Sequence, residues 1–313
     1  MVMKGIKIVP DDTKFDFVRW HVFALVFSTL VNIGAIGLTI FGGLNLGIDF
    51  TGGTAIEIRT PADPDLGAMR KAINELGFGE ASIQEFGEKR DLLIRLPQLG
   101  DDAETQKKSL ETVRATLDKQ FDKPVDYRRT EFVGPQVGKE LKLQGFYAVL
   151  FSIIGILAYV WVRFEWQFGA ACIVALLHDC FAVLGLFAVT QMEFSLTTIA
   201  AILTIAGYST NDTVVVFDRI RENLRKYKKM SLRDIINLSV NQTLSRTFVT
   251  GLTTLLALLA LYIYGGEVIR GFVYALIFGI IVGTYSSVFV ASPILLYLNL
   301  KRGDASVKKD TEA

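Results

Sequence analysis

Histidine and cysteine are scarce in this sequence, with two of each among 313 residues. Both cysteines, Cys172 and Cys180, lie in one apolar stretch, and their spacing matches neither a zinc site nor a disulfide framework. We therefore interpret them as small buried side chains. Residues 43–140 contain no histidine or cysteine and show no nucleophile–base pair. The sequence thus predicts no metal site, no cofactor and no enzyme activity.

Net charge is also nearly absent, because 33 basic and 32 acidic residues leave a formal charge of +1. A dedicated nucleic-acid binder would be strongly basic, so this balance argues against that class. The charged residues are concentrated in 60–130 and 218–246, and long stretches elsewhere have almost none. This distribution predicts an integral membrane protein with one sizeable soluble domain.

Six apolar stretches are long enough to cross a membrane, which takes about 20 residues. They are residues 22–41, 146–162, 168–188, 196–217, 248–264 and 272–298. The first stretch is too long for the core of a signal peptide, and no clear cleavage site follows it. We therefore expect it to be a retained anchor.

Basic residues predict the orientation of these spans. They are frequent in the N-terminal tail (1–21), in the connection 218–246 and in the C-terminal tail (299–313). The loops on the other side carry almost none. By the positive-inside rule, both termini are expected in the cytoplasm and residues 43–140 outside it.

The connection 218–246 is charged and also has regularly spaced apolar residues, including Ile235 and Ile236. This pattern fits an amphipathic helical connection whose apolar residues face the bundle. Its basic side chains could contact anionic membrane lipid, although the orientation of the spans already explains them.

The segment 43–140 shows strand and helix patterns in the order β-α-β-β-α-β. Strands are expected at 54–60, 81–87, 90–96 and 124–133, and helices at 63–79 and 102–121, the first capped by Asp63. This order is that of a ferredoxin-like domain. The predicted fold class is therefore an α-helical membrane protein, with six transmembrane helices and an extracytoplasmic α+β ferredoxin-like domain. The five later spans form a bundle within 146–298.

Two glycine-containing motifs flank the predicted domain. They are GIDFTGGT (47–54), with Gly47, Asp49, Gly52 and Gly53, and VGPQVGKEL (133–141), with Gly134, Pro135 and Gly138. The first lacks the Lys-Ser/Thr of a phosphate-binding loop, and no helix is expected after it, so nucleotide binding is not predicted. We interpret both motifs as hinges or rigid joints between the domain and the membrane.

Few ionisable side chains lie inside the predicted spans, where each costs about 2.5–3.5 kcal/mol to insert. His178 and Asp179 lie near the middle of the third span. Two interpretations remain open for them: a hydrogen-bonded contact between helices, or a titratable relay.

Asn211 and Asp212 lie side by side in the fourth span, and Asp212 precedes Arg219 by about two helical turns. Asp218 is interpreted as an interfacial residue. Arg246, at the start of the fifth span, lies at a depth similar to that of Asp212. The sequence therefore predicts an ion pair between Asp212 and Arg246, which is either a fixed structural pair or a reversible one that couples protonation to helix movement.

The sixth span contains a small-xxx-small pattern, Gly279–Gly283. This pattern predicts close packing against another helix, in this chain or in a partner.

Seven segments together carry a family resemblance. They are GIDFTGGT, EFVGPQVGKEL, RFEW, ALLHD, GYSTNDTVVVFDRIREN, TLSRT and YGGEVIRGF. With these, the sequence resembles the SecF subunits of the bacterial protein-export machinery, in the SecD/SecF family of the RND superfamily.

The resemblance implies a multi-pass protein of the bacterial cytoplasmic (inner) membrane. It implies a complex with SecD around the SecYEG channel, which uses the proton-motive force to complete translocation of the exported polypeptide. It also implies that Asp212 and Arg246 belong to the proton pathway, with which we group Asn211, His178 and Asp179. The absence of a SecD-like segment suggests SecF alone rather than a fused chain. The coupling ion, H⁺ or Na⁺, stays open.

Two other functions remain as alternatives. One is a subunit of a proton-driven exporter of small molecules or lipids, from the same superfamily. The other is a membrane-anchored binding or sensor protein without ion coupling, which would not need Asp212, Asn211 and Arg246 at membrane depth.

Overall fold

The computed structural model describes residues 13–97, 99, 103–266, 269–298 and 300. The described chain divides into two compact units. One is a helical bundle from within residues 1–44, 149–192 and 200–313, and the other is an α+β unit from 45–148 and 193–199. The second unit therefore includes a short loop segment that lies far from the domain in sequence.

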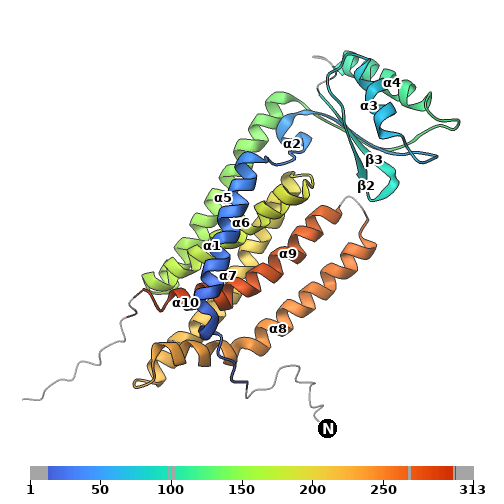
Figure 1. Cartoon of the computed structure of the whole chain (residues 1–313). Helices are drawn as coiled ribbons and strands as arrows, with labels where there is room; N and C mark the ends of the chain where they lie inside the picture. The colour runs from blue at the N-terminus through green and yellow to red at the C-terminus, as the bar shows by residue number, and fades with distance from the viewer. Residues whose placement is uncertain (1–12, 98, 100–102, 267–268, 299, 301–313) are drawn as a thin grey trace, which may run out of the picture. The chain divides into compact units, whose positions relative to one another are not determined.

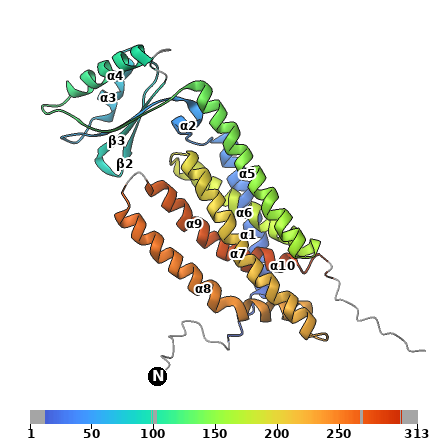
Figure 2. The same cartoon turned by 180° about the vertical axis from the view of Figure 1, so that it is seen from behind.

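The α+β unit contains one antiparallel sheet with the strand order β2-β3-β1-β4. Its elements are β1 (Gly53–Arg59), α3 (Leu66–Asn74), β2 (Ser82–Phe86), β3 (Glu88–Leu96), α4 (Ala103–Asp118) and β4 (Asp126–Val133). Both helices pack on the same face of the sheet (Figures 1 and 2). This arrangement confirms the predicted ferredoxin-like order.

The core of this unit follows from the alternation of apolar residues in the strands. The fully buried side chains include Ile56, Ile58, Leu92 and Ile94 of the sheet, and Met69, Ile73, Val113 and Leu117 of the helices. The opposite face of the sheet carries polar residues, such as Arg95 on β3. The apolar face of the sheet thus forms the core with the two helices, and the opposite face is available for polar contacts.

The predicted N-cap of α3 was wrong by two residues. Asp65 caps the helix, because its Oδ1 accepts hydrogen bonds from the backbone N–H groups of Gly67 (2.9 Å) and Ala68 (3.0 Å). Asp63 instead pairs with Arg90, at 2.8 Å. The pairing with Arg90 lowers the pKa of the Asp63 carboxyl.

Tyr127 of β4 provides a test of this domain at alkaline pH. Its phenol O–H lies within hydrogen-bond distance of two acceptors, the Arg114 carbonyl (3.0 Å) and Asp118 Oδ1 (3.2 Å). Burial raises the pKa of Tyr127 well above its usual value, and the Asp118 carboxylate adds to this effect. The neutral phenol therefore stabilises the fold below the unfolded pKa of about 10, and this contribution is lost as pH rises above it.

We expect Tyr127→Phe to reduce the loss of stability above about pH 10. The measurement is tyrosinate absorbance as a function of pH. The difference between wild type and variant should show a phenol that ionises at a higher pH than most other tyrosines of the protein. A Tyr127 difference curve centred at the ordinary phenol pKa of about 10 would contradict the prediction.

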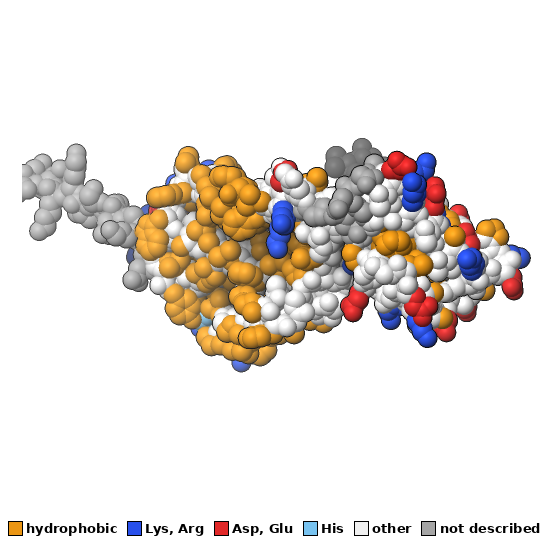
Figure 3. Space-filling view, turned by 90° about the horizontal axis from the view of Figure 1, so that it is seen from above, with side chains coloured by type: hydrophobic (Ala, Val, Ile, Leu, Met, Phe, Trp, Pro, Cys, Tyr) orange, Lys and Arg blue, Asp and Glu red, His pale blue; other side chains and the backbone are white. Residues whose placement is uncertain are grey.

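In the part of the chain that the structure describes, six helices are long and apolar enough to cross a membrane, which confirms the number of spans predicted. They include α1 (His21–Phe41), α5 (Pro135–Arg163), α6 (Trp166–Thr190), α7 (Leu196–Lys226), α8 (Leu232–Tyr264) and α9 (Arg270–Ser286). After α9, a π-helical turn (Ser287–Ala291) and α10 (Ser292–Ile294) extend the last span. On the face seen in Figure 3, hydrophobic side chains predominate on the bundle, whereas most of the charged ones lie on the α+β unit.

The connection 218–246 is not a separate helix. Helix α7 continues to Lys226 and α8 begins at Leu232, so only residues 227–231 interrupt the helices. The Ser231 hydroxyl starts α8 by accepting a hydrogen bond from the Asp234 backbone N–H, at 3.1 Å. Ile235 and Ile236 are fully buried, as their spacing indicated.

Candidate functional site: a polar seam between the helices

Asp179 on α6 is completely buried, yet both of its carboxylate oxygens have partners. Oδ1 is hydrogen bonded to Nδ1 of His178, at 3.0 Å. Oδ2 accepts hydrogen bonds from the hydroxyls of Ser209 on α7 and Ser286 on α9, the latter at 2.9 Å. The carboxylate thus joins three helices, as a buried charge needs several partners.

Glycines on α9 allow this contact. A Cβ atom at Gly279 would clash with the side chain of Ile205 on α7, and one at Gly283 would lie 2.9 Å from the Ser209 Cβ. The same Cβ at Gly283 would lie 3.6 Å from Asp179 Oδ2. The predicted small-xxx-small contact is therefore confirmed within this chain, where it brings α9 against α7.

Asp212 on α7 has a different environment. Its Oδ1 accepts a hydrogen bond from the Thr247 hydroxyl of α8, at 2.6 Å. Its Oδ2 is buried and has no hydrogen-bond partner. The Ser287 hydroxyl also lies near the Asp212 carboxylate, and it forms a hydrogen bond with the Thr213 hydroxyl, at 2.8 Å. One oxygen of this carboxylate is therefore left unsatisfied away from water.

The two carboxylates lie along one polar seam, which we define by the side chains that surround them. Its members are His178, Asp179, Ser209, Asp212, Thr213, Thr247, Ser286 and Ser287. The α7 members are spaced i, i+3 and i+4, so they share one helix face. Ser286 and Ser287 adjoin at the start of the π-helical turn, a feature often found at functional sites.

The predicted ion pair between Asp212 and Arg246 is not formed in this structure. Among the described residues, the structure shows no ion pair between them, and Arg246 is exposed. The reason is the helical rotation of about 100° per residue: because Thr247 faces Asp212, its neighbour Arg246 points away. The positive charge of Arg246 acts on the carboxylate only at longer range.

Two other predicted polar residues lie outside the seam. Asn211 is exposed on α7. Asp218, which is 43% exposed, pairs with Arg163 of α5 at 3.0 Å and with Arg221 at 3.8 Å. Asp218 is therefore an ion-paired residue near the charged end of α7.

Sequence reasoning missed the hydroxyl groups of the seam. The signal was available, because Ser209, Asp212 and Thr213 follow helical spacing within an apolar helix. It is weak, since serine and threonine also bond to carbonyls of their own helix, as Thr204 does to Ala200 at 2.8 Å.

The two glycine motifs lie in the α+β unit. Gly52 and Gly53 adopt positive φ angles of 71° and 115°, which favour glycine. A short helix, α2 (Ile48–Thr51), precedes them and was not expected. Helix α5 begins at Pro135, and a Cβ at Gly138 would lie only 3.0 Å from the Gly52 backbone nitrogen. The motifs thus pack against each other; Gly134 has open space around its Cβ position.

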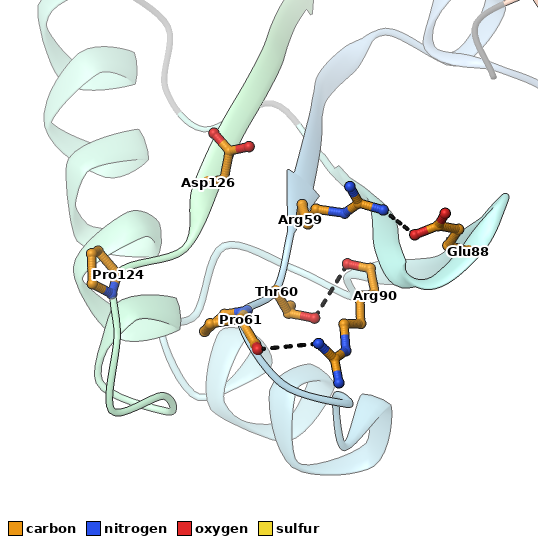
Figure 4. Close-up of a pocket in the computed structure, with 7 residues that line it drawn as sticks. All are labelled: Arg59, Thr60, Pro61, Glu88, Arg90, Pro124 and Asp126. Carbon is orange, nitrogen blue, oxygen red and sulfur yellow. Dashed lines mark hydrogen bonds and ion pairs between the residues drawn. The ribbon is translucent and has the colours of Figure 1, made fainter. Parts of the chain in front are cut away.

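A shallow pocket lies at the other end of the sheet (Figure 4). Its two arginines already have acidic partners: Arg59 pairs with Glu88 and Asp91, and Arg90 pairs with Asp63. Because these arginines are already paired with carboxylates, we interpret the pocket as structural. Among the residues that the structure describes, no group of three or more His, Cys, Asp or Glu side chains could hold a metal ion.

Comparison with known proteins identifies the family. Residues 113–301 match the model described as "Protein export membrane protein SecD/SecF, C-terminal", and residues 37–60 match the model described as "SecD/SecF GG Motif". The chain belongs to the SecD/SecF family. The polar seam lies within the first matched region, and Asp49, Gly52 and Gly53 lie within the second.

Curated members of the SecD/SecF family cover nearly the full chain. The protein translocase subunit SecF of Rickettsia bellii (strain OSU 85-389) is 48% identical, over 96% of this chain and 99% of its own. The protein translocase subunit SecF of Rickettsia akari (strain Hartford) is 46% identical, over 99% of this chain and 100% of its own. This membership assigns the chain, a multi-pass membrane protein, a role in protein export.

Solved SecD/SecF-family structures are longer than this chain. The crystal structure of SecDF from Thermus thermophilus, a translocon-associated membrane protein, matches with a TM-score of 0.84 and 40% identity, over 93% of this chain. A SecDF structure in a super-membrane-facing form matches with a TM-score of 0.68 and 39% identity, over 92%. In both cases the chain spans 39% of the solved chain.

Proposed function

We propose that this chain is the SecF subunit of the protein-export translocase, and that it uses the proton-motive force with SecD to complete polypeptide translocation. The observation that carries the proposal is the Asp212 carboxylate, which is held by Thr247 on one oxygen and left without a partner on the other. A buried carboxylate of this kind can be neutralised by one proton, which removes the cost of the unpaired charge.

The proton would change the contact between α7 and α8. With Asp212 neutral, the Thr247 hydroxyl is enough to hold the carboxyl group in place. With Asp212 charged, a stronger partner is favoured, and Arg246 is the adjacent residue on α8. Rotation or sliding of α8 toward such a pair would link proton binding and release to helix movement. Each proton carried through 100 mV supplies about 2.3 kcal/mol for this step.

The partner that we propose for the bundle is SecD. The solved SecDF chains contain much more than the part matched by this chain, which spans 39% of them. Large apolar side chains on α1 and α5, such as Phe23 (70% exposed) and Trp161 (73% exposed), offer surfaces for a second helical subunit or lipid. We place the assembly beside SecYEG in the inner membrane, with both termini in the cytoplasm.

We propose H⁺ as the coupling ion. The Thr247 hydroxyl holds one oxygen of Asp212, and the other oxygen has no hydrogen-bond partner, an arrangement that suits a proton on a carboxyl group better than a multi-ligand metal ion. An Na⁺ gradient remains the alternative outcome in the test.

Proteoliposomes that contain this chain, SecD, SecYEG and the cytosolic ATPase provide that test. An exported polypeptide arrested after its ATP-driven start should complete translocation faster when a proton gradient is imposed, and a protonophore should abolish the gain. A gain from an Na⁺ gradient alone would reassign the ion, and equal rates with and without either gradient would contradict the proposal.

A further inference from the structure

Five polar side chains of the α+β unit form a junction clasp: Asn45, Asp49, Gln84, Arg95 and Glu193. They come from the segment before β1, from β2 and β3, and from the loop between α6 and α7. The clasp therefore connects the sheet to the residues that lead into α7.

Arg95 is the centre of the clasp. Its guanidinium pairs with Glu193 Oε2 at 3.0 Å, and it donates hydrogen bonds to Asn45 Oδ1 (2.7 Å) and Gln84 Oε1 (3.1 Å). The Arg95 side chain is only 10% exposed, and that of Glu193 is 31% exposed. A nearly buried arginine with three partners fixes geometry more strictly than a surface ion pair does.

The loop that carries Glu193 is also held through its backbone. Leu46 and Phe194 form a parallel bridge, with hydrogen bonds from Gly47 N–H to the Phe194 carbonyl (2.9 Å) and from Phe194 N–H to the Asn45 carbonyl (2.8 Å). A Cβ at position 47 would lie 2.5 Å from Glu193 Oε1, so a larger residue there would displace this carboxylate. The loop thus runs directly along the segment before β1.

Asp49 holds the first residue of α7. Its Oδ2 accepts a hydrogen bond from the Leu196 backbone N–H, at 2.9 Å. A carboxylate at a helix N-terminus satisfies a free N–H group and interacts favourably with the helix dipole. Helix α5 packs closely against the first turn of α7. A Cβ at Gly145 of α5 would lie only 2.6 Å from Ile199 Cδ1.

Helix α7 therefore has two distinct ends. Its first turn belongs to the α+β unit and contacts the clasp, whereas Asp212, 16 residues after Leu196 in the sequence, belongs to the bundle. A hydrogen-bonded helix transmits a displacement along its axis with little loss. A buried ion pair is often no more stabilising than apolar packing, so stability alone does not account for Arg95.

We propose that Asp49, Arg95 and Glu193 are positioning residues that fix the start of α7 to β3, so that movement produced at Asp212 reaches the outer sheet. This inference rests on the proposed function. It adds a route by which the helix movement acts on the domain, and it assigns that route to specific side chains.

The test uses the full complex with Arg95→Gln and with Glu193→Gln. We expect each to lower gradient-driven translocation about tenfold, while the ATP-driven start and co-purification with SecD stay at wild-type levels. The double variant should be no worse than either single one, because both break the same link. Arg90→Gln is the matched control, since it breaks an exposed ion pair of the same domain.

A covalent link distinguishes positioning from a merely structural role. Paired residues on adjacent strands lie about 5 Å apart, a spacing that suits a disulfide. We therefore add Leu46→Cys and Phe194→Cys to the Arg95→Gln variant. Oxidation of the two cysteines to a disulfide should restore gradient-driven translocation. Reduction should remove the rescue. If the Arg95→Gln variant does not assemble with its partners, the same cysteine pair is tested in the Glu193→Gln variant instead.

Wild-type gradient-driven rates in Glu193→Gln, or no rescue by the formed disulfide, would overturn the inference. Asp212→Asn, measured in parallel, separates the two proposals. If it keeps the gradient response, the proposed function fails; if it loses the response while the clasp variants keep it, only the clasp inference fails.

Discussion

Asp212→Asn is expected to abolish gradient-driven translocation while the subunit stays folded and assembled. The amide keeps a carbonyl oxygen for the Thr247 hydroxyl, which donates to Asp212 at 2.6 Å. It resembles the protonated carboxyl in shape and charge but cannot release a proton. The rate with an imposed gradient should therefore fall to the rate without one, which removes the drive of about 2.3 kcal/mol per charge at 100 mV.

The control is the same substitution at Asp218, six residues or about 1.7 turns further along α7. Asp218→Asn removes a carboxylate that is 43% exposed and paired with Arg163, so we expect near-normal translocation. Thr247→Val should have an intermediate effect, because it removes the hydrogen bond but leaves the titratable group. A gradient response in Asp212→Asn equal to that of wild type would contradict the role given to this residue.

The fold was largely predictable because its two units obey simple periodicities. The strands of the α+β unit alternate in polarity, so that Ile56, Ile58, Leu92 and Ile94 all reach one core. The spans are visible from length and composition alone. Helix ends were less predictable, since the choice between Asp63 and Asp65 as the cap of α3 depended on Arg90, 25 or more residues away.

The candidate site was predictable in its carboxylates but not in their partners. Charge in an apolar helix draws attention to Asp179 and Asp212, whatever surrounds them. Which residue of a neighbouring helix faces each carboxylate depends on the rotation of that helix. The sequence predicted Arg246 as the partner of Asp212, whereas the structure has the next residue, Thr247, in that place. Likewise, the junction clasp joins Arg95 to Glu193, which are 98 positions apart, and no local pattern in the sequence indicates such a pair.

Asp179→Leu is expected to disrupt the bundle, although leucine is apolar and similar in size. The change leaves the Ser209 and Ser286 hydroxyls and the His178 ring without their shared acceptor. Interhelical hydrogen bonds in membranes average about 0.6 kcal/mol each, and a buried polar group without a partner costs about 1–3 kcal/mol. The loss should total about 2–4 kcal/mol, measurable as a lower denaturation midpoint in detergent and reduced co-purification with SecD.

Asp179→Asn separates the two interpretations that the sequence left open for this residue. The amide oxygen can accept both serine hydroxyls, and the amide nitrogen can donate to His178 when its Nδ1 carries no proton. Since every oxygen of Asp179 is already satisfied, we expect this variant to assemble and to keep its gradient response, unlike Asp212→Asn. Loss of that response in a fully assembled Asp179→Asn complex would instead make Asp179 a second titrating group. The comparison thus assigns proton binding to the carboxylate with an unpaired oxygen, and helix packing to the one whose oxygens are all bonded.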